Sequence, residues 1–296
     1  MLSWRLLVSA ILVPSLIGLF YADQATGRAA SLLLVFCGLV AVRNSWELTD
    51  LLRVRNLNPS FPITAVLSLL VIASAWAHTR FEAGTQQPAL ASLGWITAAM
   101  TLGFLVLLAY EAWQYQEPGK SMESLGANLL TLMYAGVLLA VTAQLRWFPS
   151  HETGYFALAS MIICVKSGDT FAYAFGRLWG RRKMAPKLSP GKTGMGLVGA
   201  IFGSLLGAWL WLTFAGTLFS AAPKAAALHV VLAYGFTVGM AGLIGDLCES
   251  LIKRDVQKKD SAALMPGFGG LLDLVDSPLF AGPVALAWWI LMPPAL

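Results

Sequence analysis

The chain has 296 residues, of which 57% are hydrophobic and only 12% are charged. Soluble domains are about half apolar and one quarter charged, so this composition leaves too little polar surface for a globule in water and excludes an ordinary soluble protein. The net charge is +5, but its placement along the chain matters more than its sum, and we expect no nucleic-acid partner.

The apolar residues form nine segments, most of them about 17 to 23 residues long, which is enough to cross the core of a bilayer as a helix. The segments run at approximately 6–22, 29–43, 61–78, 90–110, 125–145, 155–176, 196–218, 225–247 and 278–294. The second is the shortest. The sequence therefore predicts an all-α, polytopic integral membrane protein with about nine transmembrane helices.

Lys and Arg are distributed unequally between the loops that join these segments. One alternate set of loops, which includes the N-terminus, holds fifteen of them, whereas the opposite set holds four. Because cytoplasmic loops carry the excess of positive charge, the N-terminus and the Lys-rich loops are predicted to face the cytoplasm. With nine helices, the C-terminus is then on the other side.

Polar residues are concentrated in the second half of the chain. Residues 1–150 are predicted to form a scaffold of transmembrane helices that includes a lipid-facing part. Residues 151–296 are predicted to form a catalytic transmembrane region with two cytoplasmic loops that are rich in polar residues, 177–195 and 248–277.

The sixth segment carries Lys166 and Asp169 within an otherwise apolar stretch. Charged groups inside a spanning helix cost about 2.5–3.5 kcal/mol each, so they face a polar cavity or pair with each other. One interpretation is a structural ion pair at i, i+3. The alternative is a functional role, since Asp169 lies near the cytoplasmic end, where the basic loop begins.

The loop that follows contains six cations and the run Ser189, Pro190, Gly191, Lys192 and Thr193. Lysines supply point charge, and hydroxyl and backbone N–H groups supply donors, so this loop is suited to an oligophosphate. A basic face that docks on anionic lipid headgroups would explain the charge but not the order of these residues.

The eighth segment ends in charged sequence. Read as a continuing helix, it places Asp246, Glu249, Ser250 and Lys253 on one face. Asp273 and Asp276 follow a glycine-rich stretch and lie three apart beside the last segment. Carboxylates on two helices at one membrane surface indicate a hard-cation site of the kind that takes Mg²⁺ bridged to substrate phosphates. The alternative is a solvated charged loop.

The run from Ser250 to Asp276 resembles the signature of the phosphatidate cytidylyltransferases, also called CDP-diacylglycerol synthases. The positions in register are Ser250, Lys253, Arg254, Lys259, Asp260, Pro266, Gly267, Gly269, Gly270, Asp273 and Asp276. Upstream segments also resemble this family, around Asp169, around 189–193 and around Asp246. The N-terminal half is similar only in being helical membrane sequence.

The chain departs from the family pattern at several positions. Phe268 replaces a usual His, Leu274 replaces an Arg, and Met195 replaces a common acidic residue. Gly191 also replaces a frequent Lys. These changes remove cations or donors and a carboxylate, which would alter substrate contacts or silence the enzyme. Since Asp246 and Asp273 remain, we expect retained catalysis with altered substrate detail.

The resemblance implies transfer of a cytidylyl group from CTP to phosphatidic acid, with Mg²⁺ as cofactor and a second cation left open. The acidic positions expected to hold the metal are Asp246 and Asp273, and our hypothesis is that Asp276 and Asp169 support the metal or nucleotide site. In the same hypothesis Ser189, Lys192 and Thr193 hold triphosphate or lipid phosphate, and the leaving pyrophosphate is neutralised by Lys253, Arg254 and Lys259. Substrate-binding positions also include Pro190, Ser250, Gly269 and Gly270.

Three other functions remain open at this stage: a related enzyme that acts on another lipid phosphate or nucleotide, a catalytically silent membrane scaffold, and a transporter. The transporter fits least, because the polar residues gather at one membrane face rather than at the midplane. The expected partners are CTP, phosphatidic acid and membrane lipids, with a homodimer left open. The expected location is the bacterial inner membrane.

Overall fold

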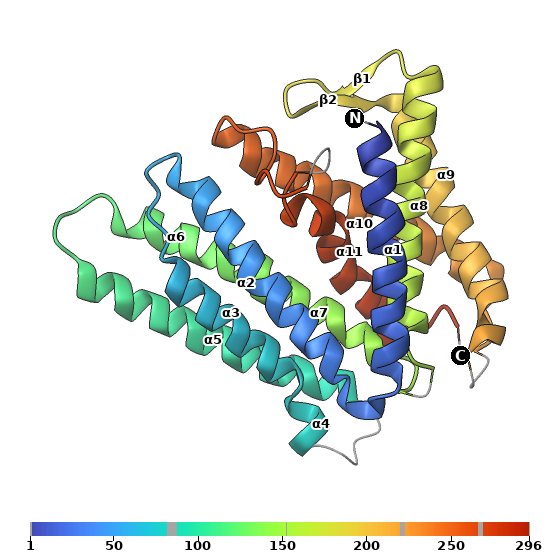
Figure 1. Ribbon diagram of the computed structural model, residues 1–296, viewed down its shortest axis with the longest axis horizontal. Helices are drawn as coiled ribbons and strands as arrows, with labels where there is room; N and C mark the ends of the chain where they lie inside the picture. The colour runs from blue at the N-terminus through green and yellow to red at the C-terminus, as the bar shows by residue number, and fades with distance from the viewer. Residues whose placement is uncertain (1, 82–87, 152, 220–222, 266–268, 296) are drawn as a thin grey trace. The chain divides into compact units, whose positions relative to one another are not determined.

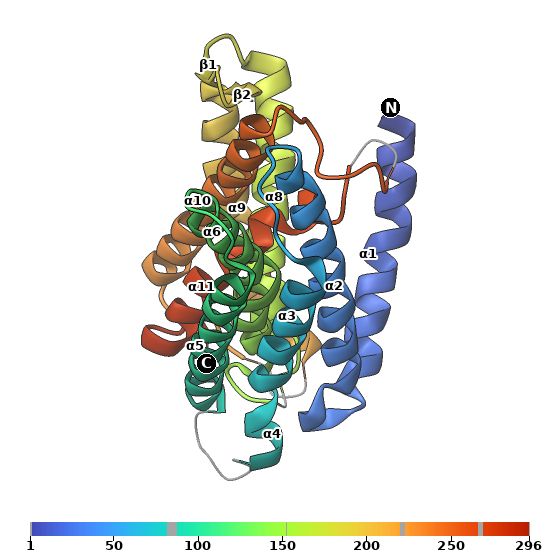
Figure 2. The same ribbon diagram turned by 90° about the vertical axis from the view of Figure 1, so that its left-hand side faces the viewer.

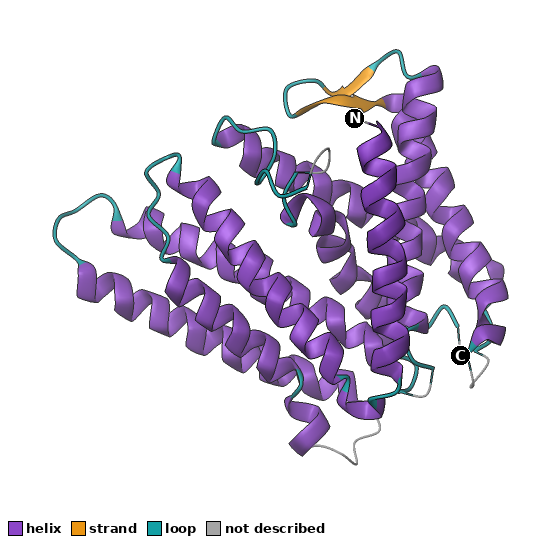
Figure 3. Ribbon diagram, viewed as in Figure 1, coloured by secondary structure: helices purple, strands orange, loops and turns teal. Residues whose placement is uncertain are grey.

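The computed structural model describes residues 2–81, 88–151, 153–219, 223–265 and 269–295, without the side chains of residues 2–7, 88 and 89. Figures 1 and 3 show that helices account for most of this chain. The predicted all-α class is confirmed, although a short β-hairpin in the second half was not expected.

The longer helices follow the predicted apolar segments in order. They are α1 (Leu2–Gln24), α2 (Ser31–Arg53), α3 (Phe61–Ala75), α5 (Pro88–Gln114), α6 (Ser121–Thr131), α8 (Phe156–Trp179), α9 (Gly194–Phe214), α10 (Leu228–Asp255) and α11 (Leu272–Leu291). A π-helical turn (Leu132–Val137) joins α6 to α7 (Leu138–Ala143), and α4 (Ala77–Phe81) is a short helix after α3. The hairpin consists of β1 (Lys183–Ala185) and β2 (Ser189–Thr193), which pair antiparallel.

Among the described residues, seven helical stretches are long and apolar enough to cross a membrane. They are Gly27–Arg53, Phe61–Phe81, Leu90–Gln114, Ser121–Trp147, Gly194–Leu218, Leu228–Asp255 and Leu272–Leu291. The polytopic membrane fold is thus confirmed, while the count of nine and the side of the N-terminus stay predictions. Two predicted segments are not among the seven. The described apolar part of α1 is short, and α8 carries Lys166, Asp169 and Arg177.

Two helices are longer at their polar ends than hydropathy predicted. The second segment was expected to end at 43, but α2 continues to Arg53 and so includes Glu47. The last apolar segment was expected to start at 278, after a helix that begins beyond the glycines and carries Asp273 and Asp276; in the structure α11 begins at Leu272 and is one continuous helix that includes both aspartates. Both extensions carry charged residues, which lower the local hydropathy without interrupting the helical backbone.

The chain forms two compact units, which are described separately. The first contains residues 1–141 and 255–274, and the second contains 142–254 and 275–296. The functional division predicted at residue 150 stays a prediction. In the first unit, α2, α3 and α5 lie side by side, as Figures 1 and 2 both show. Contacts between Ser45 and Ser68 and between Gly136 and Ser68 mark places where helices of this unit approach closely.

In the second unit, α8 and α9 pack against each other along their lengths. Gly199, Gly203 and Gly207 form a stripe on α9, and a Cβ at Gly203 would lie only 2.5 Å from the carbonyl oxygen of Ser167 on α8. The Ser167 hydroxyl donates to the Gly203 carbonyl at 2.8 Å. Small residues at such spacing let helix backbones approach in a membrane protein.

Candidate active site

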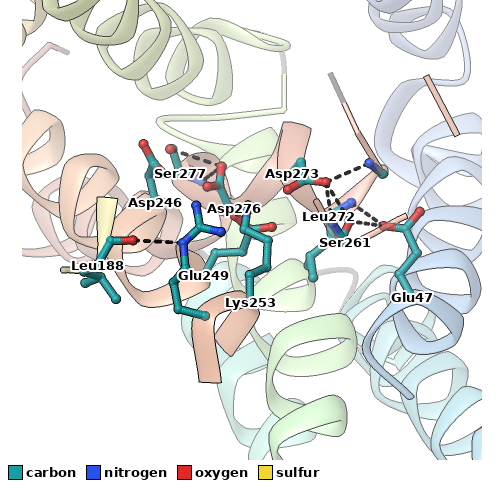
Figure 4. A network of polar contacts seen from close by, with 12 residues as sticks. Glu47, Leu188, Asp246, Glu249, Lys253, Ser261, Leu272, Asp273, Asp276 and Ser277 are labelled. Carbon is teal, nitrogen blue, oxygen red and sulfur yellow. Dashed lines mark hydrogen bonds and ion pairs between the residues drawn. The ribbon is translucent and has the colours of Figure 1, made fainter. Parts of the chain in front are cut away.

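Three carboxylates meet in the second unit. Asp246 and Glu249 lie one turn apart on α10, and Asp276 lies near the start of α11. One oxygen from each lies within 4.8 Å of one from each of the others (Figure 4). Glu249 is 1% exposed and Asp276 is 4% exposed, whereas the Asp246 side chain is 38% exposed. The cluster is thus buried on one side and accessible at Asp246.

The close approach of α10 and α11 beside this cluster depends on Gly245. A Cβ at that position would lie 2.5 Å from Cβ of Phe280 and 3.0 Å from the carbonyl oxygen of Asp276. No side chain larger than hydrogen fits such a gap without a helix shift. The residue next to Asp246 therefore allows the carboxylates of the two helices to converge.

Two lysines offset part of this negative charge. Lys192 Nζ lies 2.9 Å from Asp246 Oδ2. Lys253 forms an ion pair with Glu249 one turn earlier on α10. Buried charges are retained only when they are paired, so these contacts make the acidic cluster tolerable inside the fold. The helix face predicted from the sequence, with Asp246, Glu249 and Lys253 together, is present.

The hairpin carries Lys192 to this position. The Thr193 hydroxyl caps α9 by accepting from the Gly196 backbone N–H at 3.0 Å, which fixes the end of β2. Arg254 Nε donates to the Leu188 carbonyl at 3.3 Å, so the end of α10 contacts the hairpin turn (Figure 4). The Lys192 side chain is 17% exposed. Of the other predicted hairpin residues, Ser189 is half-buried and Pro190 is exposed.

Asp169 and Lys166 form the expected ion pair on α8, with Nζ 3.3 Å from Oδ2. The charges of Asp246 and Lys192 act on the Asp169 carboxylate. Asp169 therefore belongs to the same electrostatic environment as the acidic cluster. An ion pair that stabilises α8 and a role of Asp169 in the functional site are compatible interpretations of this pair.

Asp273 lies in a different network, within the first unit. Its Oδ2 accepts from the Ser261 backbone N–H at 2.9 Å, from the Ser261 hydroxyl at 2.8 Å and from the Gly270 N–H at 2.7 Å. Glu47 of α2 shares the same Ser261 hydroxyl through its Oε2, also at 2.8 Å (Figure 4). These contacts hold Ser261 and Gly270 close to α2.

The predicted site residues thus fall into two groups. In the second unit the structure brings together Lys192, Asp246, Lys253 and Asp276, with Thr193 and Arg254 on the elements that position them. Asp169 is within electrostatic reach of Asp246 and Lys192. In the first unit the structure brings Gly270 and Asp273 together.

The other predicted positions differ in exposure. Ser250 is buried, and Lys259 is exposed. Gly269 has a φ of +98°, a backbone conformation that favours glycine. Phe268, with Pro266 and Gly267, lies outside the described residues.

Two acidic residues were not selected from the sequence. Glu249 was recognised as part of the charged helix face but was assigned no role, although it is the most buried of the three clustered carboxylates. Glu47 was placed in a loop because the predicted second segment ended at 43. The sequence does contain an indication that Glu47 has a buried partner. Glu47 lies between Trp46 and Leu48, and an acidic residue between apolar residues requires a partner.

Comparisons with known proteins identify the family of the chain. A model of the cytidylyltransferase family matches residues 3–291. A phosphatidate cytidylyltransferase of Pseudomonas aeruginosa is 31% identical, with 97% of both chains covered. The enzyme of the same name from Haemophilus influenzae is 29% identical, with 96% of both chains covered, and the one from Chlamydia pneumoniae is 26% identical over 95% of this chain and 89% of the relative.

Proposed function

Because this chain belongs to the cytidylyltransferase family, we propose that it transfers a cytidylyl group from CTP to phosphatidic acid, forming CDP-diacylglycerol and pyrophosphate. One observation carries the proposal beyond the family: three carboxylates with oxygens within 4.8 Å are bordered by two lysines. Acidic groups for a cation next to ammonium groups for phosphates are what a metal-assisted reaction of a nucleoside triphosphate requires.

In this reaction an oxygen of the lipid phosphate attacks the α-phosphorus of CTP. The bond from the α-phosphorus to the bridging oxygen breaks, and pyrophosphate leaves with the electron pair. A phosphate monoester is already largely ionised at neutral pH, so no strong general base is needed. Positioning of the two phosphates and neutralisation of their charge therefore account for the rate.

The donor set fits Mg²⁺, which prefers carboxylate oxygens and retains several waters. We propose that Asp246 holds the ion, with Glu249 and Asp276 beside it in the second unit. The family resemblance adds Asp273 as a ligand. When bound, Mg²⁺ neutralises charge on the phosphate oxygens and orients the α-phosphate.

The proposed phosphate contacts come from both predicted loops. Lys192, with Ser189 and Thr193, binds the triphosphate or the lipid phosphate. Its ammonium, held beside Asp246, is close enough to the acidic cluster to contact a phosphate that shares the cation there. We assign Lys253, Arg254 and Lys259 to the leaving pyrophosphate, whose negative charge they would neutralise.

The lipid substrate reaches the site from the bilayer. The excess of Lys and Arg on the loops that carry the site favours the cytoplasmic face. The chain is a multi-pass membrane protein whose relatives are bacterial, so we propose the inner membrane as its location.

The test is pyrophosphate release by the purified protein in lipid with Mg²⁺, CTP and phosphatidic acid. Asp273→Asn is the variant, and Asp50→Asn is its matched control, because Asp50 is an exposed aspartate on α2. We expect release that requires both substrates, that is lost in Asp273→Asn and that persists in Asp50→Asn.

Two results would contradict the proposal. Release with another lipid phosphate in place of phosphatidic acid would indicate a related enzyme with an altered pocket. CTP binding without any product would indicate a silent binding protein. If Asp273→Asn keeps full activity, the proposed reaction still stands, but the proposal that Asp273 is a metal ligand is wrong.

A further inference from the structure

Glu47 is fully buried on α2, far in sequence from every position of the family signature. Its Oε1 accepts from the Leu271 backbone N–H at 2.9 Å and from Arg43 Nε at 2.8 Å. Its Oε2 accepts from the Leu272 N–H at 2.9 Å and lies 2.8 Å from Ser261 Oγ, whose single hydrogen it shares with Asp273 Oδ2. The carboxylate thus contacts four donor groups from three separate stretches of chain.

Two of these donors belong to the start of α11. The first N–H groups of a helix have no partner within the helix, and Leu272 is the first residue of α11. Glu47 supplies the missing acceptor from another helix, in the way that a side chain at the N-cap position does, and places a negative charge where the helix dipole favours one. It therefore fixes where α11 begins and how its first turn is oriented.

The Ser261 hydroxyl connects Glu47 to Asp273. Ser261 Oγ lies 2.8 Å from Glu47 Oε2 and 2.8 Å from Asp273 Oδ2. Gly270 packs directly against the Glu47 carboxylate and the Ser261 hydroxyl, and a Cβ at this position would clash with both. The side chain of Asp273 is thus oriented by a serine that is itself held by Glu47.

We propose that Glu47 is a positioning residue for cytidylyl transfer: it holds Ser261, the Leu271 backbone and the first turn of α11 so that Asp273 keeps its working orientation. This inference rests on the proposed function and deepens it. It makes α2, which is far in sequence from the signature residues 250–276, a part of the catalytic machinery. Glu47 itself touches no substrate.

The role requires a carboxylate. An amide at this position would present an N–H₂ group to N–H or O–H donors, and it would leave Arg43 without its anionic partner. Glu47→Gln therefore keeps the shape of the side chain but converts at least one contact into a donor facing a donor. Glu47→Asp keeps the charge with a shorter reach and is expected to restore part of the function.

The experiment compares Glu47→Gln, Glu47→Asp and the control Asp50→Asn, which removes an exposed carboxylate three residues further along α2. Four quantities are measured for each: kcat, KM for CTP, the thermal unfolding midpoint, and hydrogen exchange of the amides of residues 270–272. In Glu47→Gln we expect kcat to fall on the order of 10²-fold, as misplacement by about 1 Å does. We also expect KM for CTP to change little, exchange to rise, and Glu47→Asp to recover part of kcat.

Several results are decisive. Wild-type kcat and exchange in Glu47→Gln would overturn the proposal, as would a fall in kcat that only follows a lower unfolding midpoint without faster exchange at 270–272. If Glu47→Gln does not fold, Ser261→Ala takes its place: lower kcat with faster exchange supports the proposal, and no change overturns it. If the wild type releases no pyrophosphate, the proposed function fails, and exchange in Glu47→Gln alone decides whether Glu47 holds the loop.

Discussion

Lys192 Nζ lies 2.9 Å from Asp246 Oδ2, so the ammonium at the end of the hairpin contacts the most accessible carboxylate of the acidic cluster. In this arrangement the lysine neutralises the same carboxylate that is proposed to hold Mg²⁺. A metal held by Asp246 would compete with this lysine for the carboxylate. The Lys192 ammonium would then be free to contact a phosphate of the nucleotide.

This competition predicts opposite effects of Lys192→Met on the two ligands. KM for CTP should rise at least about tenfold, because a charge-assisted contact to phosphate is lost. The Mg²⁺ concentration that gives half-maximal rate should fall, because Asp246 loses its competing cation. KM for CTP and the half-maximal Mg²⁺ concentration are both obtained by measuring pyrophosphate release over a matrix of CTP and Mg²⁺ concentrations.

The control for that variant is Lys120→Met, which removes an exposed lysine from a loop of the first unit. It should leave both constants unchanged. A Lys192→Met protein that needs more Mg²⁺ than the wild type would show that the lysine assists the metal site rather than competing with it.

The identity of the metal ligands is a second prediction. Asp246→Asn should weaken binding of Mn²⁺, used as a paramagnetic substitute for Mg²⁺, by at least about tenfold, because a coordinating anion becomes a neutral amide. Asp276→Asn should weaken binding as well, since its oxygens lie in the same cluster. Asp50→Asn should bind Mn²⁺ like the wild type, and removal of the metal with a chelator should abolish turnover.

The same titration tests Asp273. Its Oδ2 already accepts three hydrogen bonds, so a metal would be bound through Oδ1. If Asp273 is a ligand, as the family resemblance implies, Asp273→Asn weakens Mn²⁺ binding as much as Asp246→Asn does. If it only orders the loop, Mn²⁺ affinity stays near the wild-type value while kcat falls.

The acidic face of α10 could be predicted from the sequence because helical periodicity depends only on spacing. Asp246, Glu249 and Lys253 follow one another at i, i+3 and i+7, and the helix continues far enough to place them on one face. Asp276 could be predicted in the same way from its position after Asp273. Hydropathy likewise located most of the membrane segments, because twenty apolar residues have few alternatives to a spanning helix.

Glu47 and the hairpin could not be predicted by the same reasoning. A hydropathy window ends where charged residues begin, so it stopped α2 before the residue that contacts Ser261 more than two hundred positions later. Such a contact depends on tertiary packing, which no local pattern contains. The strands around Lys192 are three and five residues long, with a bulge between them, and show no alternation of apolar and polar residues.

The pair of Glu249 and Lys253 gives a third prediction. The two side chains are 1% and 10% exposed, so removing either one leaves a buried charge that has lost this ion pair. Glu249→Gln and Lys253→Met should each destabilise the protein by about 3–5 kcal/mol. The double variant should be less destabilised than the sum of the two, because it removes both charges of the pair together.

The measurement is a double-mutant cycle on unfolding in detergent micelles. A coupling energy of at least about 1 kcal/mol is expected for residues in direct contact. Additive effects within about 0.5 kcal/mol would show that the ion pair contributes nothing beyond the two separate side chains.

The last prediction concerns the helix contact that brings the carboxylates together. In Gly245→Ala the new methyl group would lie 2.5 Å from Phe280 Cβ, so α10 and α11 must separate. Overpacking of this kind costs about 1–3 kcal/mol, and separation of the helices would also move Asp246 away from Asp276. Unfolding should therefore occur at a lower temperature, and Mn²⁺ affinity should fall with it.

Gly94→Ala is the matched control, because Gly94 lies within α5 and a Cβ there meets nothing within 4 Å. It should be neutral or slightly stabilising, by about 0.4–1 kcal/mol, since alanine restricts the unfolded chain more than glycine does. If Gly245→Ala loses stability but keeps its Mn²⁺ affinity, the helices separate without disturbing the acidic cluster, and its geometry is then set by the carboxylates and their lysines rather than by the glycine contact.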